Sequence, residues 1–316
     1  MGVLSTNLQP RSANRARFPG ALLLAAAAVL LLPGSGRTEA RTMHDRDFWV
    51  ALRSSGFALP SGESALPLAL EAAALLGSTD PQLRDEVAYQ AIETWVYREQ
   101  RLNAAELERL RIILSANARH GLGEETGDGL FLRSFSLLGL AVLAAEDLKR
   151  PFLDARQFDG LLELATAELA NERDLRGYVP GKGWGHATAH CADLLKFLAR
   201  SQWLRPEQQS RIVNAIAERL RSGGLVFVWG EDARLAAALT SVGSRADADP
   251  APFMLWFQRL GEEHAALWRG TFEPARYVPV RAQLNALSAL AADLDVDSSA
   301  GGTIRAALRS LRAEAQ

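Results

Sequence analysis

The spacing of apolar residues restricts the fold of this chain more than any other feature. Beyond residue 44, apolar side chains recur three or four positions apart almost throughout, as they do on one face of a helix. Alternating strand patterns are scarce, and only the run LVFVW, residues 225–229, resembles a short strand. The pattern therefore predicts an all-α protein. The expected helices cover residues 45–55, 63–77, 81–99, 103–119, 128–147, 155–172, 184–200, 205–221, 229–242, 251–267, 278–293 and 301–314.

Turn residues separate these segments at short intervals. The segment STDPQ, residues 78–82, places an N-cap residue and an early proline before a helix, and RSGG, residues 221–224, ends another helix with glycines. Short connections favour antiparallel neighbours. We expect a single domain of stacked antiparallel helical hairpins, either a HEAT-like α-solenoid or a curved αα-toroid. Helix rhythm supports this prediction, because the sequence shows no exact repeat period.

The first 40 residues have the layout of a secretory signal peptide. A basic segment with Arg11, Arg15 and Arg17 precedes the apolar run ALLLAAAAVLLL, and small residues follow up to Ala40. The run is shorter than the roughly 20 residues of a spanning helix. We expect cleavage after Ala40, a helical-repeat-like domain over residues 41–316, and a periplasmic or secreted protein without a transmembrane anchor. A translation start at Met43 would instead give a cytoplasmic protein.

Charge and cysteine content exclude some functions. The formal net charge is −2, and removal of residues 1–40, which carry four arginines and one glutamate, makes it −5. A mildly acidic chain without a basic run is poorly suited to a phosphate backbone, so we expect no nucleic-acid partner. Cys191 is the single cysteine, which excludes an intramolecular disulfide. Its position on an apolar helix face predicts a buried, unreactive thiol.

The candidate site is the segment RGYVPGKGWGHATAHCAD, residues 176–193. Glycines and a proline form a loop, and helical spacing then places His186, His190 and Asp193 on one stripe. Two imidazoles four residues apart, with a carboxylate one turn later, suit a divalent transition metal. The spacing lacks the glutamate of the H-E-x-x-H metalloprotease motif. The alternatives are direct ligand binding, acid–base chemistry, or histidines that hydrogen-bond neighbouring groups and fix the helix.

The loop itself supplies candidate ligand-binding residues. Arg176 and Lys182 would attract an anion toward the N-terminus of the following helix. Tyr178 and Trp184 would pack against an apolar group of a ligand; the alternative is that both aromatic rings anchor the loop to the core. The spacing does not match a phosphate-binding loop, because no Ser or Thr follows the lysine.

A further candidate lies within the most apolar helix. Polar residues are few between Leu130 and Ala145, so this helix is expected to be buried. An isolated buried charge is costly, and Arg133 therefore requires a carboxylate partner or a ligand anion. Asp85, Glu86 and Asp193 are the candidate partners. The alternative to a ligand site is a structural ion pair between helices.

The segment from Glu172 to Leu195, together with DPQLRDEVAY and LFLRSFSLL, resembles an uncharacterised bacterial family, the domain of unknown function 2785. The likeness runs from about residue 44 to residue 240 and is weaker afterwards. The resemblance implies an all-helical fold and no established activity, cofactor or catalytic residue. It also implies that six residues act as a unit, namely Arg176, Gly177, Trp184, His186, His190 and Asp193.

These patterns lead to three hypotheses of function. The first is a binding protein that holds a small ligand or a protein segment in a groove formed by the 184–200 helix, its glycine-rich loop and the helices carrying Asp85 and Arg133. The second is a metal-dependent hydrolase, in which the His–His–Asp row holds the ion and Asp85 or Glu86 is the general base. The third is a purely structural helical scaffold. The sequence does not decide whether the protein is an enzyme.

Overall fold

The computed structural model describes residues 43–294 and 299–314, and the predicted signal peptide lies outside the described residues. The regular secondary structure of these residues is helical except for one short hairpin, so the predicted all-α class is confirmed. The elements are α1 (Arg46–Ser54), α2 (Ala65–Leu75), the π-helical η1 (Gln82–Tyr89), α3 (Gln90–Glu93), the π-helical η2 (Thr94–Arg98), α4 (Ala104–Ala118), α5 (Gly129–Lys149), α6 (Ala155–Asn171), β1 (Tyr178–Val179), β2 (Gly183–Trp184), α7 (Ala187–Leu198), α8 (Pro206–Ser222), α9 (Glu231–Gly243), α10 (Ala251–Leu267), α11 (Pro274–Asp293) and α12 (Ser299–Glu314).

Local capping explains several of these boundaries. The Asn103 side chain accepts hydrogen bonds at the start of α4 while Glu106 accepts one from the Asn103 N–H. Asp154 and Gln157 make the same reciprocal pair at the start of α6. Such capping boxes satisfy backbone donors that a helix start leaves free. The observed helices therefore begin within a few residues of the predicted positions.

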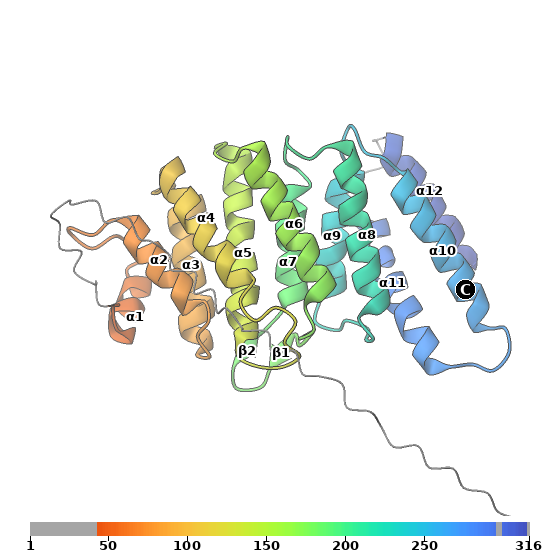
Figure 1. Ribbon diagram of the computed structural model, residues 1–316, viewed down its shortest axis with the longest axis horizontal. Coiled ribbons are helices and arrows are strands. Elements are labelled where there is room, and N and C mark those ends of the chain that lie inside the picture. The colour runs from red at the N-terminus through yellow and green to blue at the C-terminus, as the bar shows by residue number, and fades with distance from the viewer. Residues whose placement is uncertain (1–42, 295–298, 315–316) are drawn as a thin grey trace, which may run out of the picture. The chain divides into compact units, whose positions relative to one another are not determined.

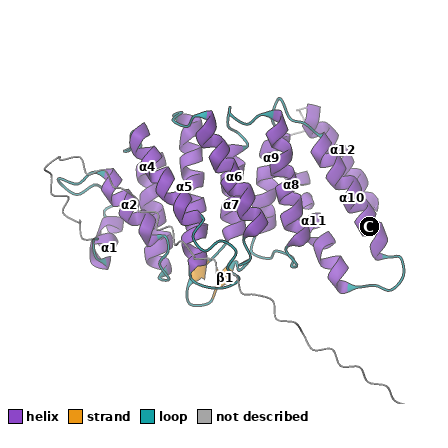
Figure 2. Cartoon of the chain, in the orientation of Figure 1, coloured by secondary structure: helices purple, strands orange, loops and turns teal. Residues whose placement is uncertain are grey.

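The strand prediction was wrong. Residues 225–229 form part of the loop between α8 and α9, and the strands of the described residues are β1 and β2, paired antiparallel (Figure 2). This hairpin also explains why the helix predicted from residue 184 begins only at Ala187. Short strands of two residues leave no alternating pattern that sequence analysis can detect.

Consecutive helices pair in antiparallel fashion and lie in two rows (Figure 1). The helices α5, α7, α9 and α11 contact one another in turn and form one row. The helices α6, α8 and α10 form the other row, and each packs on its partner from the first row. The stacked hairpins are therefore observed, whereas the HEAT-like or toroidal architecture stays a prediction.

Helix α5 lies at the centre of this packing. By length and composition it would reach across a membrane, but 83% of its most apolar window is buried inside the protein. Leu130, Phe131 and Leu140 are fully buried, and the polar Arg133 and Ser134 are also buried within it. Burial on all sides explains its nearly continuous apolar sequence.

Candidate functional site

The loop before α7 folds into the β1–β2 hairpin because glycines allow two close approaches. Tyr178 faces Trp184 across the hairpin, and the Gly185 N–H donates to the Gly177 carbonyl at 2.7 Å. A β-carbon on Gly185 would lie 2.6 Å from a leucine of α5. One on Gly177 would lie 2.2 Å from Trp229. Glycine at both positions therefore lets the hairpin rest directly on α5 and on the loop before α9.

Arg84 of η1 anchors this loop, although the sequence did not single it out. Its side chain is fully buried and donates to the Lys182 carbonyl at 2.7 Å and to the Ser78 carbonyl at 2.8 Å. The guanidinium carbon lies 4.2 Å from the centre of the Phe131 ring, a cation–π distance. The sequence did contain a signal for the burial of Arg84. It lies three residues before Val87, an apolar residue that is fully buried, so the two side chains share one face of the helix.

His186 caps the N-terminus of α7 in the left-handed conformation, with φ of 54°, which is uncommon for a residue other than glycine. Its ring packs on Trp184 with 4.5 Å between centroids. Its Nε2 is buried, has no hydrogen-bond partner among the described residues, and lies 3.8 Å from Oε1 of Glu231. Burial, helped by the positive charge of Arg234, lowers the pKa of His186 to about 4, so the imidazole is neutral near pH 7.

His190 is held in one orientation by α5. Its Nδ1 lies 2.8 Å from Oγ of Ser134 and 3.2 Å from the Ser134 carbonyl oxygen. Because the Ser134 hydroxyl donates to the Gly185 carbonyl, both oxygens act as acceptors toward Nδ1, which therefore carries the ring proton. Burial, together with the nearby His186 and Arg234, lowers the pKa of His190 to about 3. The ring is neutral, and its Nε2 carries a free lone pair.

Asp193 pairs with cations and not with the histidines. Its carboxylate accepts a hydrogen bond from Arg234 of α9 and lies 3.6 Å from Nζ of Lys196. The rings of His186 and His190 do lie together, with 6.0 Å between centroids. The structure therefore brings the two histidines of the predicted metal site together, whereas Asp193, its predicted carboxylate ligand, pairs with Arg234.

These contacts determine how many side chains are available as ligands for the predicted divalent metal ion. Within residues 43–294 and 299–314, no group of three or more His, Cys, Asp or Glu side chains is arranged to hold an ion. Catalytic zinc takes three protein ligands and structural zinc takes four. In the present arrangement Asp193 is occupied by Arg234 and Lys196, so the two histidines are left without the third predicted ligand. The metal site stays a prediction, for which a binding measurement is given below.

Arg133 has a carboxylate partner, but the predicted partners were wrong. Its guanidinium donates two hydrogen bonds to Glu172, at 2.7 and 3.2 Å, and both side chains are buried. Asp85, Glu86 and Asp193 form ion pairs with other arginines instead, namely Arg84, Arg53 and Arg234. The pair matches the structural alternative, an ion pair that connects α5 to the end of α6.

The other charged candidates also have protein partners. These ion pairs join Arg176 to Asp174, Lys182 to Asp128 and Asp85 to Arg84. The two aromatic candidates differ, since their side chains reach solvent. Cys191 is fully buried, its thiol donates to the Ala165 carbonyl, and burial raises the pKa of the Cys191 thiol well above its usual value, in agreement with an unreactive role.

A pocket of about 620 Å³ opens between the continuous helix formed by η1, α3 and η2 and the helices α5, α7 and α9. Two residues of the predicted site, His190 and Asp193, line it. The helices that carry Asp85 and Arg133 line it as well, but with other side chains. The remaining lining residues are Tyr89, Glu93, Tyr97, Leu138, Ala141, Val142, Ala145, Lys196, Phe197, Gly230, Ala233, Arg234 and Ala237.

The charged groups of this pocket neutralise one another. Glu93 accepts hydrogen bonds from Arg98 at 2.9 and 3.0 Å, and Asp193 is paired as described above. Burial, together with the charge of Glu93, raises the pKa of Tyr89 to about 12, so its hydroxyl keeps its proton. Among the described residues that line the pocket, the polar groups left to meet a ligand include the Tyr89 and Tyr97 hydroxyls and Nε2 of His190.

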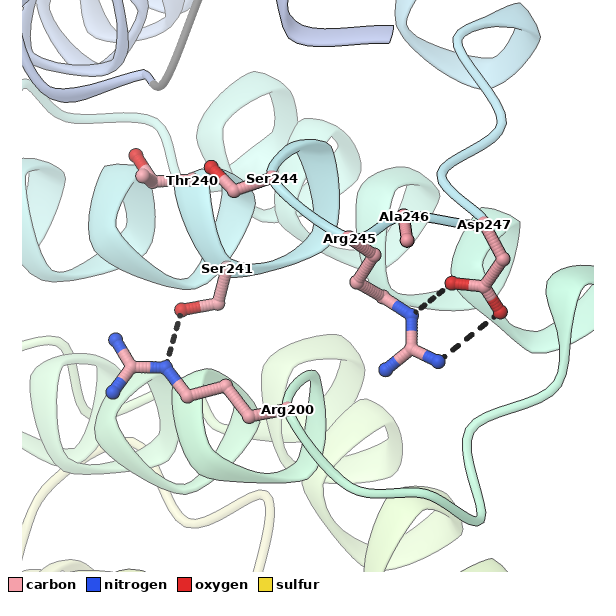
Figure 3. A pocket seen from close by; sticks show the side chains of 7 residues that line it. All are labelled: Arg200, Thr240, Ser241, Ser244, Arg245, Ala246 and Asp247. Atoms are coloured by element: carbon pink, nitrogen blue, oxygen red, sulfur yellow. Dashed lines mark hydrogen bonds and ion pairs between the residues drawn. The ribbon is translucent and has the colours of Figure 1, made fainter. Parts of the chain in front are cut away.

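A second cavity, of about 570 Å³, lies at the opposite end of α9 (Figure 3). There Arg200 donates to the Ser241 hydroxyl at 3.1 Å, and Arg245 pairs with Asp247 at 2.7 Å. Arg245 also donates to the Ala199 carbonyl at the end of α7. Arg245 thus satisfies carbonyls at the end of α7 and in the loop that follows it, and holds this loop in place. We assign no ligand to this cavity.

The fold and the site define an all-α protein with a ligand-sized pocket on one row of helices. The chain belongs to the family described as protein of unknown function, DUF2785, whose sequence model matches residues 118–290, more than half of the chain. The predicted family is therefore confirmed, although the match begins later and ends later than the predicted likeness. No curated protein and no solved structure matches the chain.

Proposed function

We propose that this protein binds a small amphipathic molecule in the pocket between the η1–α3–η2 helix, α5, α7 and α9. The volume of about 620 Å³ falls within the range of small-molecule sites, about 300–1,000 Å³. Leu138, Val142 and Phe197 contribute apolar surface, while His190 and Tyr89 contribute polar groups from separate helices. Apolar walls with few convergent polar groups are typical of ligand-binding sites.

The orientation of His190 is the observation that carries this proposal. Ser134 fixes the ring proton on Nδ1, so Nε2 offers a lone pair with no partner among the described residues. His190 lines the pocket, so a ligand hydroxyl or N–H group that enters it can donate a hydrogen bond to this lone pair. Because its pKa is about 3, His190 acts as an acceptor and not as a general base near pH 7.

The pairing of charges narrows the class of ligand. The charged side chains that line the pocket balance one another, Glu93 and Asp193 against Lys196 and Arg234, so the pocket presents no excess charge to a ligand. We therefore propose an uncharged molecule, or one with balanced charges, that carries a hydrogen-bond donor and an apolar ring or chain. The proposal includes no role for nucleic acid.

We further propose that the protein acts in the periplasm or outside the cell after removal of residues 1–40. The basic, apolar and small-residue order of this segment supports the proposal. N-terminal sequencing of the protein recovered from the periplasm or the medium tests it, with the expected mature chain starting at Arg41. A cytoplasmic protein that starts at Met43 would contradict it.

A thermal-shift screen of small metabolites, with a matched pair of pocket variants, tests the binding function. Ala233 is exposed at the pocket wall, so Ala233→Trp fills the pocket without disturbing the core. The control is Asn214→Trp, a new tryptophan on an exposed position of α8 outside the pocket. We expect a metabolite that stabilises the wild type and Asn214→Trp but not Ala233→Trp. Metabolites that stabilise all three proteins equally would contradict the proposed pocket.

A second pair of variants tests the role of Nε2. The amide oxygen of glutamine reaches about the position of Nε2, whereas asparagine ends near the position of Nδ1. We expect His190→Gln to keep most of the affinity for the stabilising metabolite and His190→Asn to lose about tenfold, the equivalent of one hydrogen bond. Equal affinity of both variants would exclude Nε2 as the acceptor.

A further inference from the structure

Three aromatic side chains form an exposed cluster beside the hairpin. Tyr178, Trp184 and Trp229 expose 45%, 40% and 50% of their surfaces. The distances between ring centroids are 5.2 Å for Tyr178 and Trp184, 5.8 Å for the two tryptophans, and 6.1 Å for Tyr178 and Trp229. Isolated exposed aromatic residues are ordinary, whereas contiguous ones mark interaction sites. We refer to these three residues as the aromatic cluster.

The backbone holds the aromatic cluster in place. Tyr178 and Trp184 are opposite each other, beside the hydrogen bond from Gly185 to Gly177, where side chains of an antiparallel pair approach closely. The absence of a side chain on Gly177 gives Trp229 its place. The backbone N–H of Trp229 donates to the buried Glu231 at 3.0 Å. The rings are therefore ordered before any partner arrives, which lowers the entropic cost of binding.

The polar groups of the aromatic cluster are donors without acceptors. Among the described residues, the two indole N–H groups and the Tyr178 hydroxyl have no hydrogen-bond partner. Five of the loop carbonyls around them are already used as acceptors within the protein. These are the carbonyls of Arg176, Gly177, Val179, Lys182 and Gly185. A suitable partner thus brings acceptors and few donors of its own.

The charges beside the aromatic cluster are also paired. Lys182 contacts Asp128 at 2.6 and 2.9 Å, and Arg176 is bound to Asp174. Since these charges already have partners within the protein, none of them requires a charged partner. The surroundings therefore favour an uncharged partner that presents apolar rings and backbone carbonyls.

We propose that the aromatic cluster binds a proline-rich segment of a partner protein in the polyproline II conformation. Such a segment has carbonyls without internal hydrogen bonds, and its prolines have no N–H groups that would need acceptors. Its pyrrolidine rings pack between tilted aromatic rings, and its preformed conformation limits the entropy lost on binding. The interaction is separate from ligand binding in the pocket.

Fluorescence anisotropy with a dye-labelled oligoproline of about ten residues tests the proposal. The control peptide is a Gly–Ser peptide of equal length, which has N–H groups and no fixed conformation. We expect saturable binding of oligoproline only. Trp184→Phe and Trp229→Phe keep an aromatic ring but remove the N–H donor, and each is expected to weaken binding about tenfold.

Trp268→Phe is the matched control variant, since Trp268 is exposed to 62% and directly follows α10, outside the aromatic cluster. It should bind oligoproline like the wild type. Circular dichroism before each titration confirms that the variants are folded. The proposal is overturned if oligoproline does not bind, if the Gly–Ser peptide binds equally well, or if the Trp184 and Trp229 variants bind unchanged. It is also overturned if an oligosaccharide binds instead with the same dependence on these tryptophans.

Discussion

Arg84 and Lys182 lie 98 positions apart in the sequence, and Nη2 of Arg84 donates a hydrogen bond of 2.7 Å to the Lys182 carbonyl oxygen. Nη1 of the same side chain donates to the Ser78 carbonyl. Because Arg84 is fully buried, loss of its guanidinium would leave both carbonyls without their donor. One arginine of η1 therefore positions the hairpin, which precedes His186 and carries part of the aromatic cluster.

Replacement of Arg84 by methionine is expected to lower the free energy of unfolding by about 3 kcal/mol, since a buried hydrogen-bonded cation is removed from its partners. Urea denaturation measures the loss, and hydrogen exchange should increase in residues 177–185. The control is Arg46→Ala, which breaks the more exposed pair with Asp80 and should cost less than about 1 kcal/mol. Equal stabilities of the two variants would contradict the anchoring role of Arg84.

Replacement by alanine should destabilise the protein at Gly177 and stabilise it at Gly160. A β-carbon on Gly177 would lie 2.2 Å from Trp229 and 2.7 Å from Glu231, so Gly177→Ala should cost about 1–3 kcal/mol. Gly160 lies inside α6 with no atom within 4 Å of its added β-carbon. Gly160→Ala should therefore gain about 0.5–1 kcal/mol, the difference in helix propensity. Thermal denaturation distinguishes the two variants. If Gly177→Ala left the stability unchanged, Trp229 would be free to move away from the added methyl group.

The helices were predictable because apolar spacing and capping residues are local signals. The segment from Ala251 to Leu267 was predicted with both ends correct, since Pro250 and the apolar stripe mark its start. The β1–β2 hairpin was not predicted, because its pairing depends on Arg84 and on close contacts with α5 that are distant in the sequence. Tertiary contacts of this kind have no local pattern.

The site was predictable only in part. Helical spacing correctly placed His186 and His190 side by side, but spacing within one helix does not identify partners on other helices. Ser134 and Arg234, which orient His190 and hold Asp193, could not be inferred for that reason. Tyr89, Glu93 and Tyr97 gave a weak signal, since residues spaced by four lie on one helix face and all three line the pocket.

Addition of zinc tests the predicted metal site. Because Asp193 is paired with Arg234 and no third His, Cys, Asp or Glu among the described residues is arranged beside the two histidines, we expect no stoichiometric binding of Zn²⁺ by calorimetry and no shift of the melting temperature on chelation. The double variant His186→Ala, His190→Ala provides the comparison. Stoichiometric binding that is lost in a folded double variant would instead support the hydrolase hypothesis.

The low pKa of His190 links its burial to stability. Its folded pKa is about 3 and its ordinary pKa is 6.5, so the unfolded chain takes up a proton before the folded chain does. The stability from the neutral ring is present above pH 6.5 and is lost as the pH falls. Between about pH 7.5 and pH 5, the wild type should lose about 2 kcal/mol relative to His190→Asn. The wild type should lose the same amount of stability relative to His190→Gln. If the stabilities of all three proteins ran parallel over this pH range, the lowered pKa of His190 would be contradicted.

Glu168 should produce the opposite pH dependence. Its side chain is buried in α6, and burial together with the neighbouring Glu172 raises the pKa of Glu168 to about 8 from its ordinary value of 4.5. The stability from the protonated carboxyl is fully present below pH 4.5 and declines as the pH rises toward 8. Glu168→Gln keeps the shape and a donor toward Glu172 but carries no charge at any pH.

This variant should therefore gain stability relative to the wild type by about 3 kcal/mol between about pH 5 and pH 7.5, as measured by urea denaturation. Glu163→Gln, at an exposed position of the same helix, should show little pH-dependent difference because water solvates its carboxylate in both states. If Glu168→Gln were less stable than the wild type by a constant amount at every pH, Glu168 would be ionised in the folded protein. Arg133 and Arg219 would then have to balance two buried carboxylates instead of one.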